Sequence, residues 1–304
     1  MVQLLNIALC GASGNLDQKV LQELIESNKF NITVLVRSNN HPDIPASVAT
    51  ALVNYQSIDS LTSALKGKNA VVSTLGTFAI SSQKLLIEAA VAAGVQRFIP
   101  SEFGSDTLNE EVRSLPVYKD KLDAQKVLAD KAADGAITYT LILNNAYLDW
   151  GLDVGFLLDI RKLSIELRDG GDQLFSTTKL SAVGKAVVGV LTHPNETANR
   201  AVYIHDIAIS QKKLLKLAQA QTPGEEWEVT EADTAELVKQ SDETLRTNPS
   251  DPFLWYGYIK RAIWGQGLGG HFQQVDNSLL GIPEITEAEV SELLQNLLKP
   301  GYKI

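Results

Sequence analysis

Short apolar runs alternate with amphipathic segments through the first half of the chain. The runs have strand length and are apolar on both faces, which is typical of parallel strands covered by helices on both sides. They span residues 4–10, 32–37, 51–53, 70–75, 95–100 and 137–143. Between them, residues 15–28 and 82–93 carry apolar side chains at helical spacing. The pattern predicts an α/β fold with a doubly wound parallel sheet.

After about residue 150 the alternation becomes irregular. A strand is expected near residues 163–167 and a helix through 183–191, and a last helix begins at the capping-box spacing of Thr286 and Glu289. We therefore expect one sheet domain over residues 1–150 and a smaller α/β lobe over residues 151–304. Interleaving of the two is left open.

Charge and composition argue against two classes of binding partner, nucleic acids and membranes. The formal net charge is −9 and the chain has no basic run, whereas nucleic-acid binding uses clustered Lys and Arg, so we expect no nucleic-acid partner. No apolar run approaches the roughly 18 residues of a membrane span, so we expect no membrane. The single cysteine, Cys10, cannot form an internal disulfide, and the first ten residues lack a basic leader and a cleavage site. The expected location is the cytoplasm.

The segment GASGNL at residues 11–16 follows an apolar strand and opens a helix. N–H groups at a helix N-terminus can bind a pyrophosphate, while the glycines permit a tight turn. A bare G-x-x-G turn can also end a strand that binds nothing, but the strand–turn–helix context favours a dinucleotide site. Residues 1–150 are thus predicted to be a Rossmann-type NAD(P)-binding domain, and the second lobe to hold the substrate. The cofactor residues predicted from this turn are Gly11, Ser13, Gly14, Asn15 and Leu16.

Asp17 takes the place of the third glycine in the expected G-x-x-G-x-x-G pattern. A side chain there can hinder helix–strand packing, and a carboxylate in the first helical turn repels phosphate even while it favours the helix dipole. Two outcomes stay open. The site binds more weakly, or Asp17 points away and stabilises the helix N-terminus.

The second predicted strand ends in Val36-Arg37-Ser38. An acidic residue at this position would accept hydrogen bonds from the ribose of NAD, whereas an arginine pairs with the 2′-phosphate of NADP. The alternative is that Arg37 is a solvated surface charge. Arg37 therefore favours NADP(H) as the cofactor.

The most specific motif is RFIPSEFG at residues 97–104, which closes the run QKLLIEAAVAAGVQ of residues 83–96. With the GASGN turn, the LVR strand end, STLG at residues 73–76 and NNAYLDW at residues 144–150, it resembles the isoflavone reductase-like group of atypical short-chain dehydrogenases, close to the NmrA-like proteins. The DWGL run at residues 149–152 is similar to the fungal branch. The resemblance covers most of the chain. It implies further cofactor residues at Thr74, Leu75, Gly76, Phe103, Asn145, Ala146 and Tyr147.

In that family a lysine at the start of the helix after the SEFG loop is assigned the catalytic role. Lys121 matches better than Lys119, because an apolar face continues from it through Ala124, Val127 and Leu128. An ammonium there can hold the nicotinamide ribose, or donate a proton and stabilise developing negative charge. The alternative is a solvated lysine on an exposed helix.

Other candidates are weaker. The Tyr-x-x-x-Lys spacing at Tyr256 and Lys260 comes too late in the chain for a short-chain dehydrogenase pair. The four histidines are scattered without metal-ligand spacing, so we expect no metal. The aromatic stretch at residues 253–264 either lines a substrate pocket or packs as an ordinary amphipathic helix.

These features predict an NADPH-dependent reductase of a small aromatic or polyketide-like carbonyl or enone substrate, with Lys121 assisting. Two alternatives stay open. One is a non-catalytic NADP-binding regulator of the NmrA type, and the other is a redox-neutral dehydratase or isomerase on the same fold. The exact substrate, the stereochemistry and the oligomeric state are left open.

Overall fold

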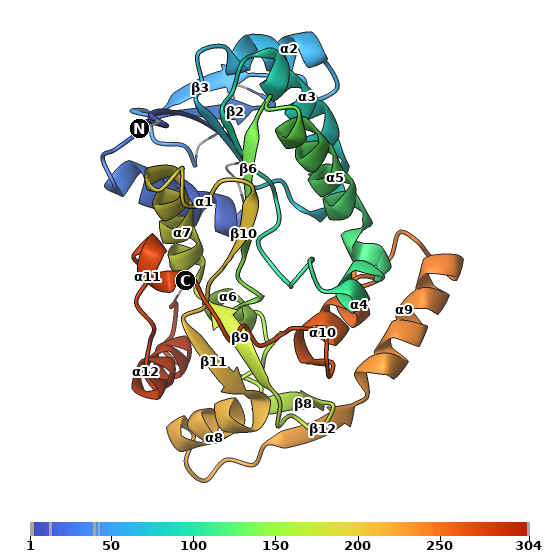
Figure 1. Ribbon diagram of the computed structural model, residues 1–304. Coiled ribbons are helices and arrows are strands. Elements are labelled where there is room, and N and C mark those ends of the chain that lie inside the picture. The colour runs from blue at the N-terminus through green and yellow to red at the C-terminus, as the bar shows by residue number, and fades with distance from the viewer. Residues whose placement is uncertain (1–2, 12–13, 39–40, 42, 303–304) are drawn as a thin grey trace.

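The computed structural model describes residues 3–11, 14–38, 41 and 43–302. A seven-stranded sheet forms the upper half of the molecule in Figure 1, in the order β10-β6-β5-β4-β1-β2-β3. Every neighbouring pair in it is parallel. This confirms the predicted α/β fold with a doubly wound parallel sheet. Its strands are β1 (Asn6–Cys10), β2 (Asn31–Val36), β3 (Ala49–Leu52), β4 (Ala70–Ser73), β5 (Arg97–Ile99), β6 (Thr138–Leu143) and β10 (Arg200–Tyr203).

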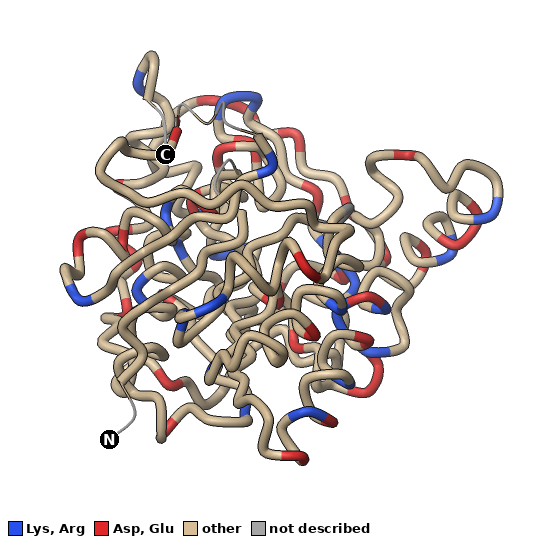
Figure 2. Tube along the Cα trace, turned by 90° about the horizontal axis from the view of Figure 1, so that it is seen from above, with Lys and Arg blue, Asp and Glu red and all other residues tan. Residues whose placement is uncertain are grey.

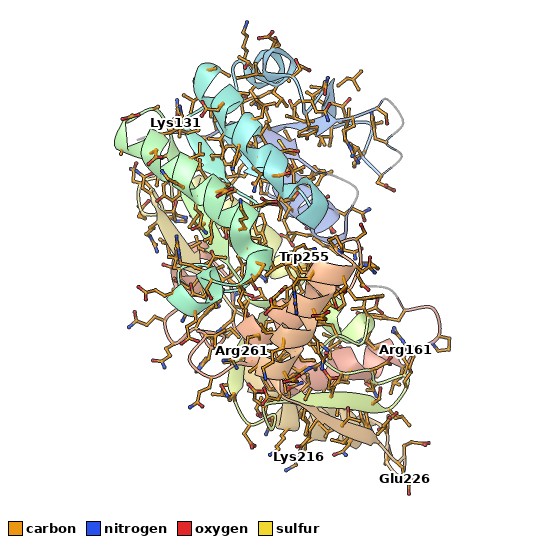
Figure 3. The ribbon with its side chains drawn as sticks, turned by 90° about the vertical axis from the view of Figure 1, so that its right-hand side faces the viewer. Lys131, Arg161, Lys216, Glu226, Trp255 and Arg261 are labelled. Carbon is orange, nitrogen blue, oxygen red and sulfur yellow. The ribbon has the colours of Figure 1, made fainter. Side chains whose placement is uncertain are left out.

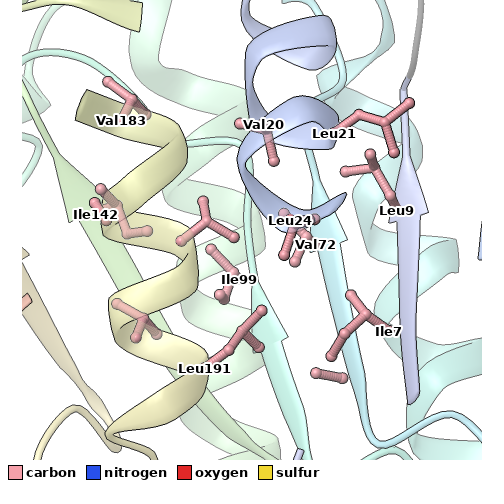
Figure 4. Close-up of a cluster of buried hydrophobic side chains, with 14 of the residues drawn as sticks. Ile7, Leu9, Val20, Leu21, Leu24, Val72, Ile99, Ile142, Val183 and Leu191 are labelled. Atoms are coloured by element: carbon pink, nitrogen blue, oxygen red, sulfur yellow. The ribbon is translucent and has the colours of Figure 1, made fainter. Parts of the chain in front are cut away.

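Helices cover both faces of this sheet, which is why its strands are apolar on both sides. In β1, Ile7 and Leu9 face one core, while Ala8 and Cys10 face the other. The first core is closed by α1 (Asn15–Glu26) and α7 (Leu180–Thr192), as Figure 4 shows. The second is closed by α2 (Ile58–Leu65), α3 (Gln83–Ala92) and α5 (Lys119–Ala133).

One covering helix and one edge strand of the large sheet come from beyond residue 150. The strand β10 pairs with β6 in parallel, and α7 packs tightly along α1. A Cβ on Gly184 of α7 would lie 2.7 Å from Glu23 Cγ and 2.9 Å from the carbonyl oxygen of Lys19, so glycine permits this close approach. The large sheet is therefore built from both halves of the chain, and a domain boundary at residue 150 stays a prediction.

The lower half of the molecule is a smaller α/β lobe. Its strands form a three-stranded sheet, β11-β9-β7, and a parallel pair, β12-β8. Their bounds are β7 (Ala146–Tyr147), β8 (Ser164–Arg168), β9 (Leu174–Thr178), β11 (Ile207–Ser210) and β12 (Glu228–Ala232). The helix α11 (Asn277–Leu280) packs against α7 of the large sheet. The helices of the smaller lobe are α6 (Leu148–Asp153), α8 (Gln211–Gln221), α9 (Thr234–Thr247), α10 (Tyr256–Trp264) and α12 (Glu287–Leu297).

The last of these helices begins with the predicted capping box. The Thr286 hydroxyl accepts from the Glu289 N–H at 3.3 Å, and the Glu289 carboxylate accepts from the Thr286 N–H at 2.8 Å. The paired helices α9 and α10 lie side by side at the edge of the lobe (Figure 3, where Trp255 and Arg261 are labelled). Acidic and basic residues are interspersed along the chain in Figure 2. Among the helices of the described chain, none combines the length and apolarity needed to cross a bilayer.

Candidate functional site

Two joined cavities lie at the carboxyl ends of the central strands, where ligands bind in open parallel sheets. One, of about 340 Å³, lies beside the ends of β1 and β2. The other, of about 620 Å³, extends toward the smaller lobe. Asp17, Thr74, Leu75 and Gly76 line both, so they form one cleft. We call the two parts the first cavity and the second cavity.

The glycine turn closes tightly onto the end of β4. Gly11 has φ +110°, and a Cβ built on it would lie 2.5 Å from Thr74 Oγ1. The Thr74 N–H in turn donates to the carbonyl of Cys10 at 2.8 Å. Only glycine therefore fits at position 11.

The residues predicted from this turn divide between the two cavities. Gly11 lines the first cavity, whereas Gly14, Asn15 and Leu16 line the second. Ser13 lies outside the described residues. Gly11 and the start of α1 thus lie on the two sides of the junction of the two cavities, which is where a pyrophosphate would join the halves of a dinucleotide.

Asp17 combines features of the two outcomes left open by the sequence. Its carboxylate accepts a hydrogen bond from the Gly14 N–H at 3.0 Å, which is the half of a capping box that the third helical residue supplies, so it does stabilise the start of α1. It does not point away, because it lines both cavities. It therefore uses one of the N–H groups that a phosphate at this turn would need.

Arg37 lies where the second-strand pattern places it. It is exposed directly after β2 and lines the first cavity together with Ser38. The half-buried Tyr55 forms one wall of the same cavity, and its hydroxyl donates to the carbonyl of Leu35 at 3.4 Å. The first cavity thus has a flat aromatic side chain on one wall and a guanidinium at the end of β2, a pairing suited to a phosphorylated nucleoside.

The SEFG loop is fixed by three successive carbonyl oxygens, those of residues 102–104. The first accepts from Lys121 Nζ, the second from Tyr147 Oη at 2.6 Å, and the third from the Asn145 N–H at 2.9 Å. Phe103 and Asn145 have φ of +35° and +51°, a region that non-glycine residues rarely adopt. These contacts bring the predicted Phe103, Asn145 and Tyr147 to one wall of the second cavity.

Lys121, not Lys119, faces the cleft. The Lys121 ammonium lies at the wall of the second cavity, 5.8 Å from the ring centre of Tyr118. Burial lowers the pKa of Lys121, and the nearby charge of Glu102 partly offsets this. The Lys119 side chain is 74% exposed and pairs with Asp123 at 3.0 Å. Of the two candidates, only Lys121 is placed to meet a bound molecule.

Asn145 and Ala146 join the two halves of the molecule. The Asn145 side chain donates to the carbonyls of Ser176 at 3.0 Å and Gly270 at 2.7 Å, and the Ala146 carbonyl accepts from Thr177 Oγ1 at 3.0 Å. Both residues line the second cavity. Their side-chain and backbone contacts hold the cavity wall in place.

Aromatic rings form the far wall of the second cavity. Tyr147 and Trp150 lie 6.3 Å apart, Trp150 and Phe156 6.4 Å, and Phe156 and Tyr256 5.8 Å. All four residues line the cavity. We call these residues the aromatic wall.

The stretch at residues 253–264 takes both roles that the sequence left open. Tyr256, Ile259 and Ile263 line the second cavity from one face of α10. Tyr258 and Trp264 are 0% and 1% exposed and pack in the core. The three-residue and four-residue spacing of the lining positions is a helical signal that could have separated the two faces.

Several lining residues were not predicted from the sequence. Glu102 and Phe156 line the second cavity, and His41 and Asp43 line the first. Among the scattered histidines, the His205 ring bonds Ser176 Oγ at 2.9 Å in a buried contact. Within the part of the chain that the structure describes, no group of three His, Cys, Asp or Glu side chains could hold a metal ion.

The sequence and the fold match known proteins. The model of the NmrA-like family matches residues 5–257. The chain belongs to this family. The predicted family resemblance is thereby confirmed. This NmrA-like chain is 32% identical to oxidoreductase aprR of Aspergillus flavus, over 97% of this chain and 99% of the relative.

A second relative and a solved structure extend the comparison. Oxidoreductase poxI of Penicillium oxalicum is 33% identical, over 93% of this chain and 92% of the relative. The binary complex of leucoanthocyanidin reductase with NADPH from Vitis vinifera has a TM-score of 0.78 and 18% identity, and covers 95% of this chain and 99% of that one. At that identity the likeness shows that the NmrA-like chain shares the fold.

Proposed function

We propose that this NmrA-like protein is an NADPH-dependent reductase of a small aromatic or polyketide-like carbonyl or enone compound. Its class is that of an oxidoreductase, the name carried by two relatives that match almost the whole chain. The observation that carries the proposal is the joined cleft. Arg37 lies in one part, and a buried ammonium and an aromatic wall lie in the other.

The residues of the first cavity and the turn fit NADPH. Arg37 and Ser38 would hold the 2′-phosphate, and the N–H groups at the start of α1 would hold the pyrophosphate. Gly11 lets the end of β1 approach Thr74 at the end of β4, because a Cβ there would lie 2.5 Å from Thr74 Oγ1. Asp17 would have to release the Gly14 N–H for the phosphate to use it. The residues of the turn and the first cavity therefore fit NADPH, except for the Asp17 carboxylate, whose negative charge opposes a phosphate.

The second cavity suits the nicotinamide of NADPH and the substrate that it would reduce. Phe103, Asn145 and Tyr147 would border the nicotinamide, whose chemistry is to supply a hydride to an electrophilic carbon. The apolar aromatic wall would pack against a flat substrate and exclude water. A substrate oxygen would then lie in a mainly apolar cavity that has the Lys121 ammonium on its wall.

Lys121 would balance the charge of the reduction. As a carbonyl carbon is reduced, its oxygen gains an electron pair, and Lys121 Nζ donates a proton to that oxygen to give the alcohol. In an enone the same oxygen carries the negative charge of the enolate. The neutral amine that remains regains its proton from water. Because burial lowers the pKa of Lys121, the ammonium is a better proton donor than an exposed lysine.

Binding and turnover test the proposal together. NADPH and NADH are titrated by calorimetry, and NADPH consumption is then followed with a panel of aromatic ketones and enones. We expect tighter binding of NADPH than of NADH, and turnover of at least one compound. The Lys121→Met variant should keep NADPH affinity while turnover falls by a factor of about 10² or more. NADPH binding without turnover across the panel would contradict the reductase and leave the regulator or the redox-neutral enzyme.

A further inference from the structure

A buried carboxylate next to Lys121 has no part in the proton donation or in cofactor binding. Glu102 is 2% exposed and lies on the wall of the second cavity. Its Oε2 accepts from the hydroxyl of Thr107 at 2.9 Å, while its buried Oε1 has no hydrogen-bond partner among the described residues. Burying a carboxylate with an unused acceptor costs free energy. The carboxylate is therefore held in place despite a cost in stability.

The helix α5 contacts Glu102 in two ways. Lys121 and Gln125 lie one turn apart on one face of this helix. Lys121 Nζ donates to the backbone carbonyl of Glu102, and Gln125 Nε2 donates at 2.8 Å to the Thr107 hydroxyl that bonds the carboxylate. A hydroxyl has one proton, so its donation to Glu102 leaves a lone pair for Gln125. One network thus fixes the carboxylate relative to the ammonium.

The tyrosines that face Lys121 are neutral. Tyr118, from the turn before α5, donates its hydroxyl to Ser105 Oγ at 2.8 Å, and Tyr147 of β7 donates to the carbonyl of Phe103. Burial raises the pKa of both hydroxyls well above the ordinary value. They therefore contribute no charge at neutral pH.

The other carboxylates around Lys121 are placed differently. Asp17 of α1 lines the same cavity and caps that helix at Gly14. On α5 itself, Asp120 is adjacent in sequence, and Asp123 is paired with Lys84 at 2.7 Å. Of these carboxylates, Glu102 is the one whose charge bears on the pKa of Lys121, and it favours the protonated amine against the effect of burial.

We propose that Glu102 is a positioning residue, whose buried carboxylate keeps Lys121 protonated and ready to donate its proton to the substrate. The geometry that carries the proposal is the shared network of α5, Thr107 and the SEFG loop. The inference rests on the proposed function for the use of that proton. The charge state itself is a property of the protein alone. Glu102 does not need to touch the substrate.

Competitive labelling of amines measures this charge state directly. The protein is treated with trace acetic anhydride from pH 6 to pH 11, and the acetylation of each lysine is read by mass spectrometry. Lys162, with an 81% exposed side chain, is the internal reference. Glu102→Gln keeps the shape of the side chain and removes its charge. Glu102→Asp keeps the charge but moves it away from Lys121, because the side chain is one methylene shorter. Asp130→Asn removes an equal charge from the exposed face of α5, where its side chain is 66% exposed.

We expect Glu102→Gln to lower the midpoint of Lys121 labelling by about one pH unit, which is a tenfold increase in free amine at a given pH. Glu102→Asp should give a smaller shift and Asp130→Asn none. In turnover, the alkaline limb of the kcat profile should move by the same amount while the KM for NADPH stays constant. A folded Glu102→Gln protein with an unchanged midpoint would overturn the proposal.

The experiment separates this inference from the proposed function. Labelling needs neither NADPH nor substrate, so a shifted midpoint supports the role of Glu102 even if no compound is reduced. Absence of turnover then counts against the reductase alone. If Glu102→Gln does not fold, by circular dichroism, Glu102→Asp decides, and an unchanged midpoint in that variant overturns the proposal.

Discussion

Asp17 is the residue at which local stability and ligand binding compete. Its carboxylate stabilises the N-terminus of α1 through the Gly14 N–H, and the same N–H is a donor for a phosphate. A cofactor pyrophosphate would therefore meet a negative charge at the junction of the two cavities. Cofactor affinity then depends on how far hydrogen bonds to the phosphate outweigh this repulsion and the loss of the helix cap.

Removing this charge should tighten NADPH binding. In Asp17→Asn the amide oxygen can still accept from Gly14, so the cap is kept and the repulsion is lost. In Asp17→Gly the cap and the repulsion are both lost, and the Gly14 N–H becomes available to a phosphate. We expect a dissociation constant for NADPH lower by about tenfold in Asp17→Gly, equivalent to about 1.4 kcal/mol, and an intermediate value for Asp17→Asn.

Calorimetry at low and high salt checks the cause of this change. The gain should shrink as salt rises, because screening weakens the repulsion in the wild-type protein. Asp172→Asn, at a side chain that is 76% exposed, is the control for a change in net charge. Weaker NADPH binding in both Asp17 variants would mean that the carboxylate helps to build the site.

The sequence predicted which residues lie near the cleft better than it predicted where their side chains point. Arg37 could be placed from the sequence because it follows directly on a strand end, whereas Lys121 was placed by the family resemblance. The direction of Asp17 could not be predicted, since both a capping and an outward rotamer suit the third position of a helix. The hydrogen bonds around the Glu102 carboxylate join Thr107, five residues further on, to Gln125 of α5, and no local pattern marks this contact between a loop and a helix.

At the scale of elements, strands with two buried faces were predicted most closely. The apolar runs of residues 4–10 and 137–143 contain β1 and β6, because a covered parallel strand is apolar throughout. The expected helix at residues 183–191 lies within α7, but its place on the large sheet was not predicted. The strand β10 has four residues, and its partner β6 lies about sixty residues earlier, so no local pattern marks the pairing.

Two buried carboxylates hold the start of α7. Asp206 accepts from the N–H of Lys179, and Asp149 accepts from that of Leu180 at 3.1 Å. Burial raises the pKa of Asp206 from 3.8 to about 6, although the Lys179 N–H opposes this shift. The folded state therefore binds a proton that the unfolded state releases between these values.

The sign of the resulting pH dependence follows from linkage. The contribution of Asp206 to stability is fully present below pH 3.8 and is lost as pH rises through about 6, which amounts to about 3 kcal/mol at most. Asp206→Asn, which does not titrate, should flatten the fall in unfolding free energy between pH 4 and pH 7, as measured in urea. The exposed control Asp172→Asn should leave the slope unchanged. An equal slope in Asp206→Asn would show that the carboxylate is not the cause.

For the whole molecule, the site arises where the two halves of the chain meet. The large sheet supplies the turn and Arg37, while β7, α6, the segment after α6 and α10 supply one residue each of the aromatic wall. Apolar patterns predicted the first of these parts, because it is built from consecutive strand–helix units. The second depends on packing between α10 and distant segments such as Phe156, so the pattern of residues 253–264 alone left two interpretations open.

Transfer of a labelled hydride from the nicotinamide to a substrate would be the direct signature of an NADPH-dependent reductase. NADPH deuterated at C4 of the nicotinamide, in either stereochemical form, is incubated with the protein and the panel of aromatic ketones and enones, and the products are read by mass spectrometry. We expect a reduced product that carries one deuterium from one of the two forms, at a rate strongly reduced in Lys121→Met. Bound NADPH with no labelled product from either form would contradict the proposed function.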